Sequence, residues 1–477
     1  MLAFMGFLMV FATIYLLIRG KGSPITVMIM VPVISAFIVG TNFEQLSGYV
    51  GAGIEAVMNN AVLFIFSIIF FSVMQDLGVF DPMVDWLTEK AGNSPVAITV
   101  VTAIIGVIAH IDGATATTVL VTIPSMYPIY KKLGLKTEVL LLLTTVGMGV
   151  MNLLPWGGPV ARVASVLGMD ANNLWLMLIP VQLFGLLLIL ALAVFLGLQE
   201  KKRLSTTGVE SGNIETEAVH TAKLAGVNGG NIELEAEQTT TPSGIASVED
   251  AEDFAEAEVK EEKKETKKER KARKLLPFNT IWTFIVIGVL VWNVMPAYLV
   301  FMIGLSVTYF VNYPTLKEQN ESFGKHAGAA LTISATMLAA GVMVGIMDGT
   351  GMVEAMAGVL TGIIPDILGR FTHLIFGIVS TPLGLMVSTD AYFFGFMPPI
   401  LEVGSQFDVA SLDTAIAMLM GKNMSLMISP IVPATFLALG LVDDVGYEQH
   451  LKFSFKYVWL LSLLMLAFAF LVGIIQF

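Results

Sequence analysis

Apolar runs of about 20 residues, separated by short polar segments, recur along the whole chain. A run such as residues 176–198 is apolar on every face, which favours a transmembrane helix over the alternating strands of a membrane barrel. The first run lacks a basic leader, so we expect it to be retained as a span. Spans are expected near residues 2–19, 24–40, 60–80, 138–168, 174–198, 279–294, 296–313, 327–347, 411–440 and 455–476, with interrupted regions at 95–131 and 370–402.

Composition agrees with an all-α, multi-pass membrane protein. Of the 477 residues, 55% are hydrophobic and only 13% are charged. The sequence contains no cysteine, which excludes disulfides, thiolate metal sites and cysteine nucleophiles. It also lacks a phosphate-loop motif, so we expect no nucleotide hydrolysis. We further expect no bound cofactor and no nucleic-acid partner.

One hydrophilic segment, residues 199–276, divides the apolar runs into two groups. An acidic run followed by a basic run, with few large apolar residues, cannot bury enough surface to fold by itself. We therefore predict an N-terminal membrane repeat at residues 1–198, a charged cytoplasmic linker at 199–276 and a C-terminal inverted membrane repeat at 277–477.

The two membrane halves match each other in sequence. "IDGATATTVLVTIPSMYPI" corresponds to "STDAYFFGFMPPILEV", and "GMGVMNLLPWGGPVA" corresponds to "GKNMSLMISPIVPAT". The offset is nearly constant, 278 residues between Asp112 and Asp390 and 274 between Pro159 and Pro433. An odd number of crossings inverts the second half, and Lys and Arg then gather on one, cytoplasmic, face, opposite to the expected loops 41–59 and 348–369. Inverted repeats with interrupted segments are typical of secondary transporters.

The first interrupted region holds "HIDGATATT", residues 110–118, and the second holds Ser388, Thr389 and Asp390. An ionisable residue at membrane depth indicates a functional site. Asp112 and Asp390 offer the oxygen ligands that divalent cations prefer, and Asp112 or His110 can equally carry a proton. The alternatives are that Asp112 and His110 merely cap a turn and pair with each other there, and that Asp390 is a helix N-cap.

Two later spans are interrupted by proline and glycine. "MNLLPWGGPVAR" predicts an unwound stretch whose freed amide groups, at Gly157 and Gly158, cradle an anion beside Asn152. Arg162 then pairs with a substrate carboxylate or anchors the helix at the interface.

The second interrupted span carries a cation at membrane depth. In "GKNMSLMISPIVPAT", Lys422 indicates a substrate or counter-ion role rather than snorkelling, with Asn423 and Ser425 beside it. Asp76 and Asp348 match each other too, but each lies at a span end close to glycine, and we interpret both as structural.

At these interruptions the chain resembles the CitMHS family, the citrate and divalent metal:proton symporters of the ion transporter superfamily. The resemblance rests on "AHIDGATATTVLVTIPSMYPIYKKLGL", "MNLLPWGGPVARVASVLG", "STDAYFFGFMPPILE" and, more weakly, "GKNMSLMISPIVPATFLALGL". It implies proton-driven uptake of citrate bound to Mg²⁺ or Ca²⁺, by an elevator-like movement, in a plasma-membrane protein that forms a homodimer.

The resemblance also implies a binding site. Its residues are Asp112, Thr117, Thr118, Asn152, Gly157, Gly158, Arg162, Ser388, Thr389, Asp390, Asn423 and Ser425, to which the residue patterns add His110 and Lys422; the metal of the complex would meet Asp112 and Asp390. The family usually has a second acid after the first hairpin Asp-Gly, whereas this chain has Ala114.

Two other functions fit parts of the pattern. A sodium-coupled dicarboxylate carrier would use the hairpin hydroxyls and carbonyls for Na⁺. An intramembrane aspartyl enzyme would pair Asp112 with Asp390, but the repeats place the two residues on hairpins that enter from opposite sides. We therefore predict a transporter and not an enzyme.

Overall fold

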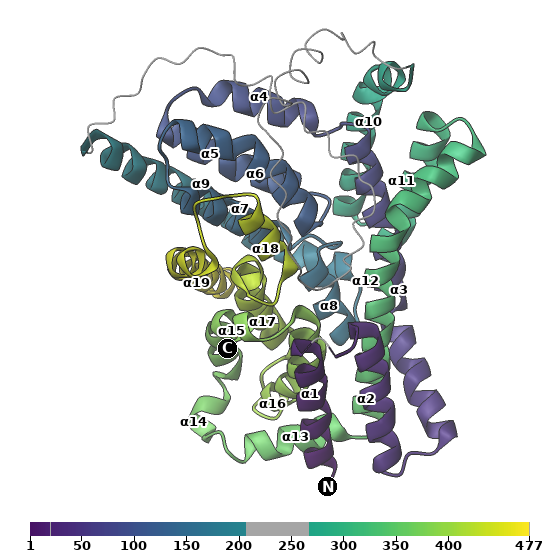
Figure 1. Ribbon diagram of the computed structural model, residues 1–477. Helices are drawn as coiled ribbons and strands as arrows, with labels where there is room; N and C mark the ends of the chain where they lie inside the picture. The colour runs from purple at the N-terminus through teal and green to yellow at the C-terminus, as the bar shows by residue number, and fades with distance from the viewer. Residues whose placement is uncertain (20, 207–266, 477) are drawn as a thin grey trace, which may run out of the picture. The chain divides into compact units, whose positions relative to one another are not determined.

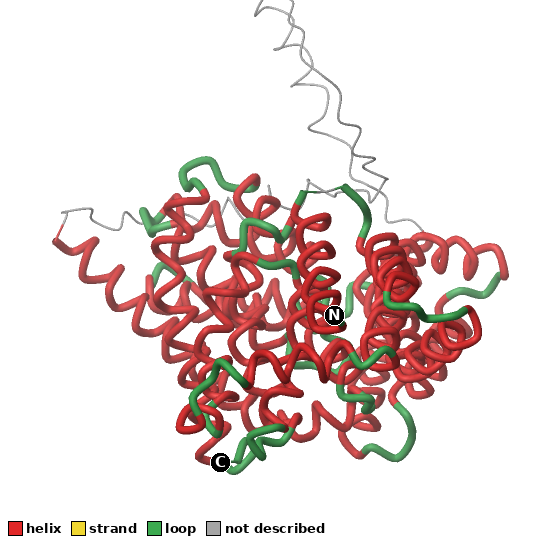
Figure 2. Tube along the Cα trace, turned by 90° about the horizontal axis from the view of Figure 1, so that it is seen from below, coloured by secondary structure: helices red, strands yellow, loops and turns green. Residues whose placement is uncertain are grey.

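The computed structural model describes residues 1–19, 21–206 and 267–476, and this part of the chain contains helices and loops but no strand (Figure 2). The helices of residues 1–206 and 277–476 pack into one compact unit. Residues 207–266, most of the predicted linker, lie outside the described residues. The predicted all-α class is confirmed.

Within the described ranges, the nine helices of the first half have counterparts in the same order in the second half, which contains α14, η4 and η5 in addition. The first half consists of α1 (Leu2–Ile18), α2 (Pro24–Ile38), α3 (Phe43–Asp76), α4 (Asp81–Ala91), α5 (Pro95–Ala109), α6 (Thr115–Lys132), α7 (Thr137–Met151), α8 (Gly158–Val166) and α9 (Ala171–Thr206). The second half consists of α10 (Lys267–Trp292), α11 (Ala297–Asn312), α12 (Leu316–Gly349), α13 (Met352–Thr361), α14 (Asp366–Gly369), α15 (Thr372–Met386), the π-helix η4 (Ala391–Phe396), α16 (Met397–Ser405), α17 (Ser411–Ser425), the 3₁₀ helix η5 (Leu426–Ile428), α18 (Pro433–Gly440) and α19 (Tyr447–Leu471).

Several of these segments are long and apolar enough to cross a membrane. Among the described residues there are six, which are α3, α9, α12, α19, residues 274–292 of α10 and the α17–α18 segment. The second half is inverted relative to the first: α4 and its counterpart α13 lie at opposite ends of the helical bundle, at the top and bottom of Figure 1.

The expected loop at 41–59 and the expected start of a span at residue 60 are wrong, because α3 already begins at Phe43. Asn42 Oδ1 accepts a hydrogen bond from the backbone of Gln45 at 2.8 Å, and Gln45 Oε1 accepts one from the backbone of Asn42 at 3.1 Å. This reciprocal capping box starts the helix well before its hydropathy rises. The expected loop 348–369 likewise contains α13 and α14.

Helices α3 and α12, each 34 residues long, pack against each other backbone to backbone. A Cβ atom on Gly53 would lie 2.0 Å from the carbonyl oxygen of Gly341, and one on Gly345 would lie 2.2 Å from that of Tyr49. At the end of α3, Asp76 Oδ2 lies 2.7 Å from Lys325 Nζ. Asp76 thus joins the two long helices, in agreement with a structural role.

The two interrupted regions form helical hairpins, and the two interrupted spans form broken helices. Hairpin 1 comprises α5, residues 110–114 and α6, and hairpin 2 comprises α15, residues 387–390, η4 and α16. Break 1 is residues 152–157, between α7 and α8, and break 2 is residues 426–432, between α17 and α18.

Each hairpin packs closely on the helix that precedes the break of its own half. A Cβ atom on Gly147 of α7 would lie 3.2 Å from the carbonyl carbon of Gly106 in hairpin 1. A Cβ atom on Gly421 of α17 would lie 2.6 Å from the carbonyl oxygen of Gly377 in hairpin 2. Glycine at these matching positions lets each hairpin lie directly beside the helix that leads to its break.

Candidate functional site

The tip of hairpin 1 is a tight turn that holds Asp112 among buried groups. Gly113 has φ of +73°, a left-handed conformation that glycine adopts without strain. Asp112 Oδ1 accepts a hydrogen bond from the backbone of Ala114 at 2.8 Å. Asp112 Oδ2 is buried without a hydrogen-bond partner, although the Thr117 hydroxyl interacts with the same carboxylate. One carboxylate oxygen is therefore left for a ligand.

His110 ties the tip of hairpin 1 to break 1. Its Nδ1 lies 2.7 Å from the Thr118 hydroxyl and its Nε2 lies 3.0 Å from Asn152 Oδ1. Trp156 of break 1 donates from Nε1 to the carbonyl of Ile111 at 2.6 Å. The expected pairing of His110 with Asp112 is wrong, because both ring nitrogens have these other partners. The expected capping is confirmed for Asp112, whose Oδ1 accepts a hydrogen bond from the backbone of Ala114 in the same turn.

Break 1 depends on glycine for its shape. A Cβ atom on Gly157 would lie 2.4 Å from the carbonyl oxygen of Asn152. The carbonyl of Gly158 accepts a hydrogen bond from Arg162 Nη1 at 2.9 Å, and a Cβ atom there would lie 2.7 Å from the same nitrogen. Asn152 Nδ2 is buried without a partner. The two glycines therefore leave space for the backbone and for the guanidinium.

Asp390 at the tip of hairpin 2 forms an ion pair with Arg162 of the first half. Arg162 Nε and Nη2 each lie 2.7 Å from Asp390 Oδ1. Asp390 occupies the N-cap position of η4, as the N-cap alternative expected, but its side chain makes no capping hydrogen bond to the helix. The backbone of Ala391 donates instead to Ser388 Oγ at 3.4 Å, and Thr389 lies half-buried between them.

Lys422 is fully buried on α17 and holds the first arm of hairpin 2. Its Nζ donates to the carbonyls of Gly384 at 2.6 Å and Val387 at 2.9 Å. These carbonyls belong to the C-terminal end of α15, where a helix lacks internal donors and carries partial negative charge. The contact excludes snorkelling to the surface. Ser425 Oγ donates to the carbonyl of Lys422 at 2.9 Å.

Asn423 joins the two broken helices. Its Nδ2 donates to the carbonyl of Gly149 on α7, and its Oδ1 is buried without a partner. Gly149 and Asn423 occupy matching positions, 274 residues apart, so the pseudo-two-fold relation between the repeats brings these positions together. The two broken helices therefore contact each other just before their breaks.

These contacts bring predicted site residues together in two groups, one around His110 at the tip of hairpin 1 and one around Arg162 and Asp390 at the tip of hairpin 2. Their role in binding a ligand stays a prediction. Among the residues that the structure describes, no three His, Asp or Glu side chains form a ready-made metal site.

The sequence interpretation missed Tyr392, a fully buried residue whose hydroxyl bonds to Ser380 Oγ. The ring centre of Tyr392 lies 5.6 Å from Lys422 Nζ. The motif "TDAYFFG" contains this tyrosine and was a signal that could have found it.

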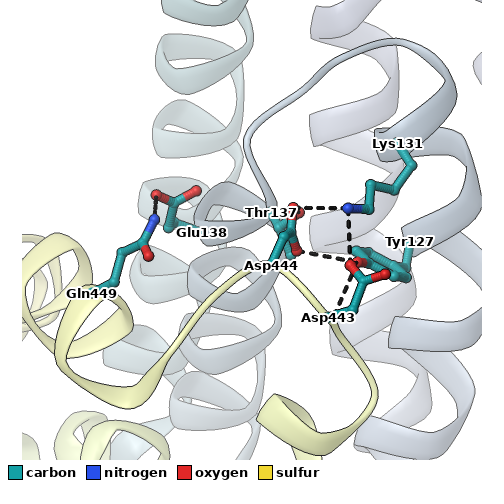
Figure 3. A network of polar contacts seen from close by, with 7 residues as sticks. All are labelled: Tyr127, Lys131, Thr137, Glu138, Asp443, Asp444 and Gln449. Atoms are coloured by element: carbon teal, nitrogen blue, oxygen red, sulfur yellow. Dashed lines mark hydrogen bonds and ion pairs between the residues drawn. The ribbon is translucent and has the colours of Figure 1, made fainter.

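A second polar network, away from the breaks, fixes hairpin 1 to the second half (Figure 3). Lys131 Nζ of α6 lies 2.9 Å from Asp443 and 3.3 Å from Asp444, in the loop between α18 and α19. Tyr127 donates to both aspartates, and Thr137 donates to Asp444 at 2.9 Å. Hydrogen bonds from Tyr127 and Lys131 lower the pKa of Asp443 below its usual value.

A cavity of about 610 Å³ lies next to this network and not at the breaks. Its lining includes Glu138, Glu448 and Lys452. It is open to the surface and contains none of the predicted site residues.

Comparisons with known proteins identify relatives over the whole chain. The profile of CitMHS, the citrate transporter family, matches residues 5–421. Two Bacillus subtilis (strain 168) proteins are similar along their full length: a citrate transporter, 32% identical over 479 residues that cover 100% of each chain, and an Mg²⁺/citrate complex secondary transporter, 33% identical over 476 residues that cover 100% of this chain and 99% of the other. The crystal structure of the Alcanivorax borkumensis YdaH transporter, described as having an unusual topology, matches with a TM-score of 0.45 and 12% identity over 91% of this chain and 87% of that one.

Proposed function

The chain belongs to the citrate transporter family CitMHS, a family of transporters and not of enzymes, and from this we propose that it moves citrate across the membrane as a complex with a divalent cation. The relative named as an Mg²⁺/citrate complex transporter supports this cargo. The cation, Mg²⁺ or Ca²⁺, travels as part of the substrate.

The observation that carries the proposal is a set of buried polar atoms without partners on the hairpin 1 tip and the broken helices. They are Asp112 Oδ2, Asn152 Nδ2 and Asn423 Oδ1. A buried polar atom without a partner costs about 1–3 kcal/mol, so a ligand that supplies the missing partners gains that much at each atom. A citrate–cation complex offers both kinds of partner, since its carboxylates accept hydrogen bonds and its hydroxyl and cation approach oxygen atoms.

The charged side chains fit the two parts of this cargo. Arg162 has the planar donor pair that binds a carboxylate, and Gly158 lies beside it. The expected free amide of Gly157 is wrong, because this N–H donates to the carbonyl of Leu154 at 2.8 Å. Asp390 supplies carboxylate oxygens for a hard divalent cation. In this proposal citrate supplies most ligands of the metal, which agrees with the absence of a three-residue acidic or histidine cluster among the described residues.

We propose that protons drive uptake, with Asp112 as the coupling residue. Its unpartnered, buried Oδ2 is an atom that a proton can neutralise. The runner-up is a sodium-coupled dicarboxylate carrier, in which Na⁺ takes the same oxygen. Replacing Na⁺ with choline at fixed pH separates these two possibilities, because uptake is lost only in the second.

We propose an elevator-like movement of the hairpins and broken helices against the α3–α12 pair, in the plasma membrane and as a homodimer. The close backbone contact between α3 and α12 supports a rigid pair, and the hairpins pack on α7 and α17, in a separate group. Residues 199–276 would then connect the two repeats, 1–198 and 277–477, on the cytoplasmic side.

The test is uptake of radiolabelled citrate into proteoliposomes under an imposed pH gradient, with and without Mg²⁺ or Ca²⁺. We expect uptake to need both the cation and the gradient. Absence of uptake in every combination, by protein shown to be folded, would contradict the proposed substrate.

A further inference from the structure

The two opposite charges that would receive a citrate–cation complex are bound to each other in this structure. Arg162 Nε and Nη2 both lie 2.7 Å from Asp390 Oδ1. A third donor of the same guanidinium, Nη1, bonds to the carbonyl of Gly158. The pair connects α8 of the first repeat to the tip of hairpin 2 in the second.

The surroundings of the pair make its separation costly. The two side chains are only 13% and 16% exposed, and a largely buried charge that loses its partner destabilises a site strongly. The nearby Lys422 is no substitute for Arg162, because its ammonium already donates to the carbonyls of Gly384 and Val387. A ligand that binds Arg162 in place of Asp390 must therefore also supply a positive charge to the Asp390 carboxylate.

We propose that the Arg162–Asp390 ion pair makes citrate transport depend on the divalent cation, because a carboxylate of the complex exchanges onto Arg162 while the cation exchanges onto Asp390. This inference rests on the proposed function and adds a specificity-determining pair to it. Metal-free citrate would satisfy Arg162 but leave Asp390 as a bare carboxylate beside a polyanion. A free cation would satisfy Asp390 but leave Arg162 without an anion.

The repeats show that the pair is specific to one side of the molecule. Arg162 follows Pro159 by three residues, and the residue that follows the matching Pro433 by three is Phe436. Asp112, the counterpart of Asp390, therefore has no matching arginine. The proposed exchange of ion-pair partners therefore concerns the tip of hairpin 2 and not the tip of hairpin 1.

Two variants test the anion contact and the cation contact of the exchange separately. In Asp390→Asn, Arg162 has lost its anionic partner, so citrate no longer needs the cation. The ratio of uptake with saturating Mg²⁺ to uptake with EDTA should fall by roughly tenfold or more relative to the wild type, since one lost charge interaction of this kind is worth at least a tenfold change in binding. In Arg162→Gln, Asp390 is free, and the purified protein should bind Mg²⁺ alone, which the wild type should bind at least roughly tenfold more weakly.

The matched control is Asp348→Asn, which removes an exposed carboxylate of α12 outside the site and should keep the wild-type metal ratio. Proteoliposome uptake is measured together with citrate and Mg²⁺ binding to the purified proteins by calorimetry, so a variant that fails to fold is recognised and the other variant still decides. Metal-dependent uptake by the wild type, with an unchanged ratio in Asp390→Asn and no Mg²⁺ binding by Arg162→Gln, would overturn the exchange and leave the proposed function standing. No citrate uptake by folded wild-type protein would overturn both.

Discussion

The two hairpin tips carry aspartates at matching positions, yet the two carboxylates have different partners. Asp390 is paired with Arg162, whereas Asp112 accepts one backbone hydrogen bond and keeps Oδ2 buried and unpartnered. Both repeats therefore contain the aspartate, but only the first contains the arginine. The position in the second repeat that matches Arg162 is Phe436. We infer that equivalent residues have separate tasks: Asp390 receives the cation of the cargo, and Asp112 binds the coupling ion.

The largest effect is expected from removing both acids. Asp112→Ala combined with Asp390→Ala should lower citrate uptake by roughly 100-fold or more, since it removes the proposed ligand of the coupling ion and the proposed ligand of the divalent cation, and charge interactions of this kind are worth about 2–5 kcal/mol each. Uptake by proteoliposomes is the measurement, with the amount of inserted protein determined in parallel. Uptake near the wild-type level would remove both residues from the site.

Lys422→Met should have the next largest effect. The change leaves the carbonyls of Gly384 and Val387 without their buried donor, at a cost of about 1–3 kcal/mol for each. We expect a lower unfolding temperature in detergent and a roughly tenfold fall in uptake, as the end of α15 loses its cap. Lys456→Met, at an exposed position of α19, is the control, and equal stability of the two variants would contradict the capping role.

The difference between the two hairpin tips can be removed by one substitution. Phe436→Arg places an arginine on α18 at the position that matches Arg162 and offers Asp112 a partner. Because an ion pair would then occupy the oxygen proposed for the coupling ion, uptake driven by a pH gradient should fall roughly tenfold. Phe436→Leu keeps the position apolar and should leave the dependence on the gradient unchanged, so a similar loss in both variants would point to packing instead.

A much smaller effect is expected at the network of Figure 3. Asp443→Asn removes an exposed partner of Lys131 and Tyr127, and exposed ion pairs contribute little, so uptake at pH 7 should change by no more than roughly twofold. Since these partners lower the pKa of Asp443, its contribution to stability is present above the usual aspartate pKa of about 3.9 and is lost as the pH falls through its lower, folded-state pKa. A stability difference between the variant and the wild type that disappeared already between pH 7 and pH 5 would contradict this assignment.

Much of the architecture could be predicted from the sequence, because local residue patterns determine it. Apolar runs located the spans, and Gly, Pro and ionisable residues at matching positions located the hairpins and the breaks. The start of α3 was missed, since the polar capping box of Asn42 and Gln45 precedes the apolar run that was used to find the span.

The contacts within the site could not be predicted in the same way. Arg162 and Asp390 are 228 residues apart in sequence, and no local pattern indicates that they meet. The sequence predicted that His110 either binds a ligand or pairs with Asp112. Its actual partner, Asn152, lies 42 residues later in the chain. Such pairings depend on how the inverted repeats pack together, which single-residue patterns do not contain.

The most direct test of the division between the two aspartates compares citrate uptake by Asp112→Asn and Asp390→Asn in the same proteoliposomes, with and without Mg²⁺ and with and without a pH gradient. We predict that Asp390→Asn loses dependence on Mg²⁺ and keeps dependence on the gradient, while Asp112→Asn shows the opposite pattern. The same response to metal and gradient in both variants would contradict separate tasks for the two hairpin tips.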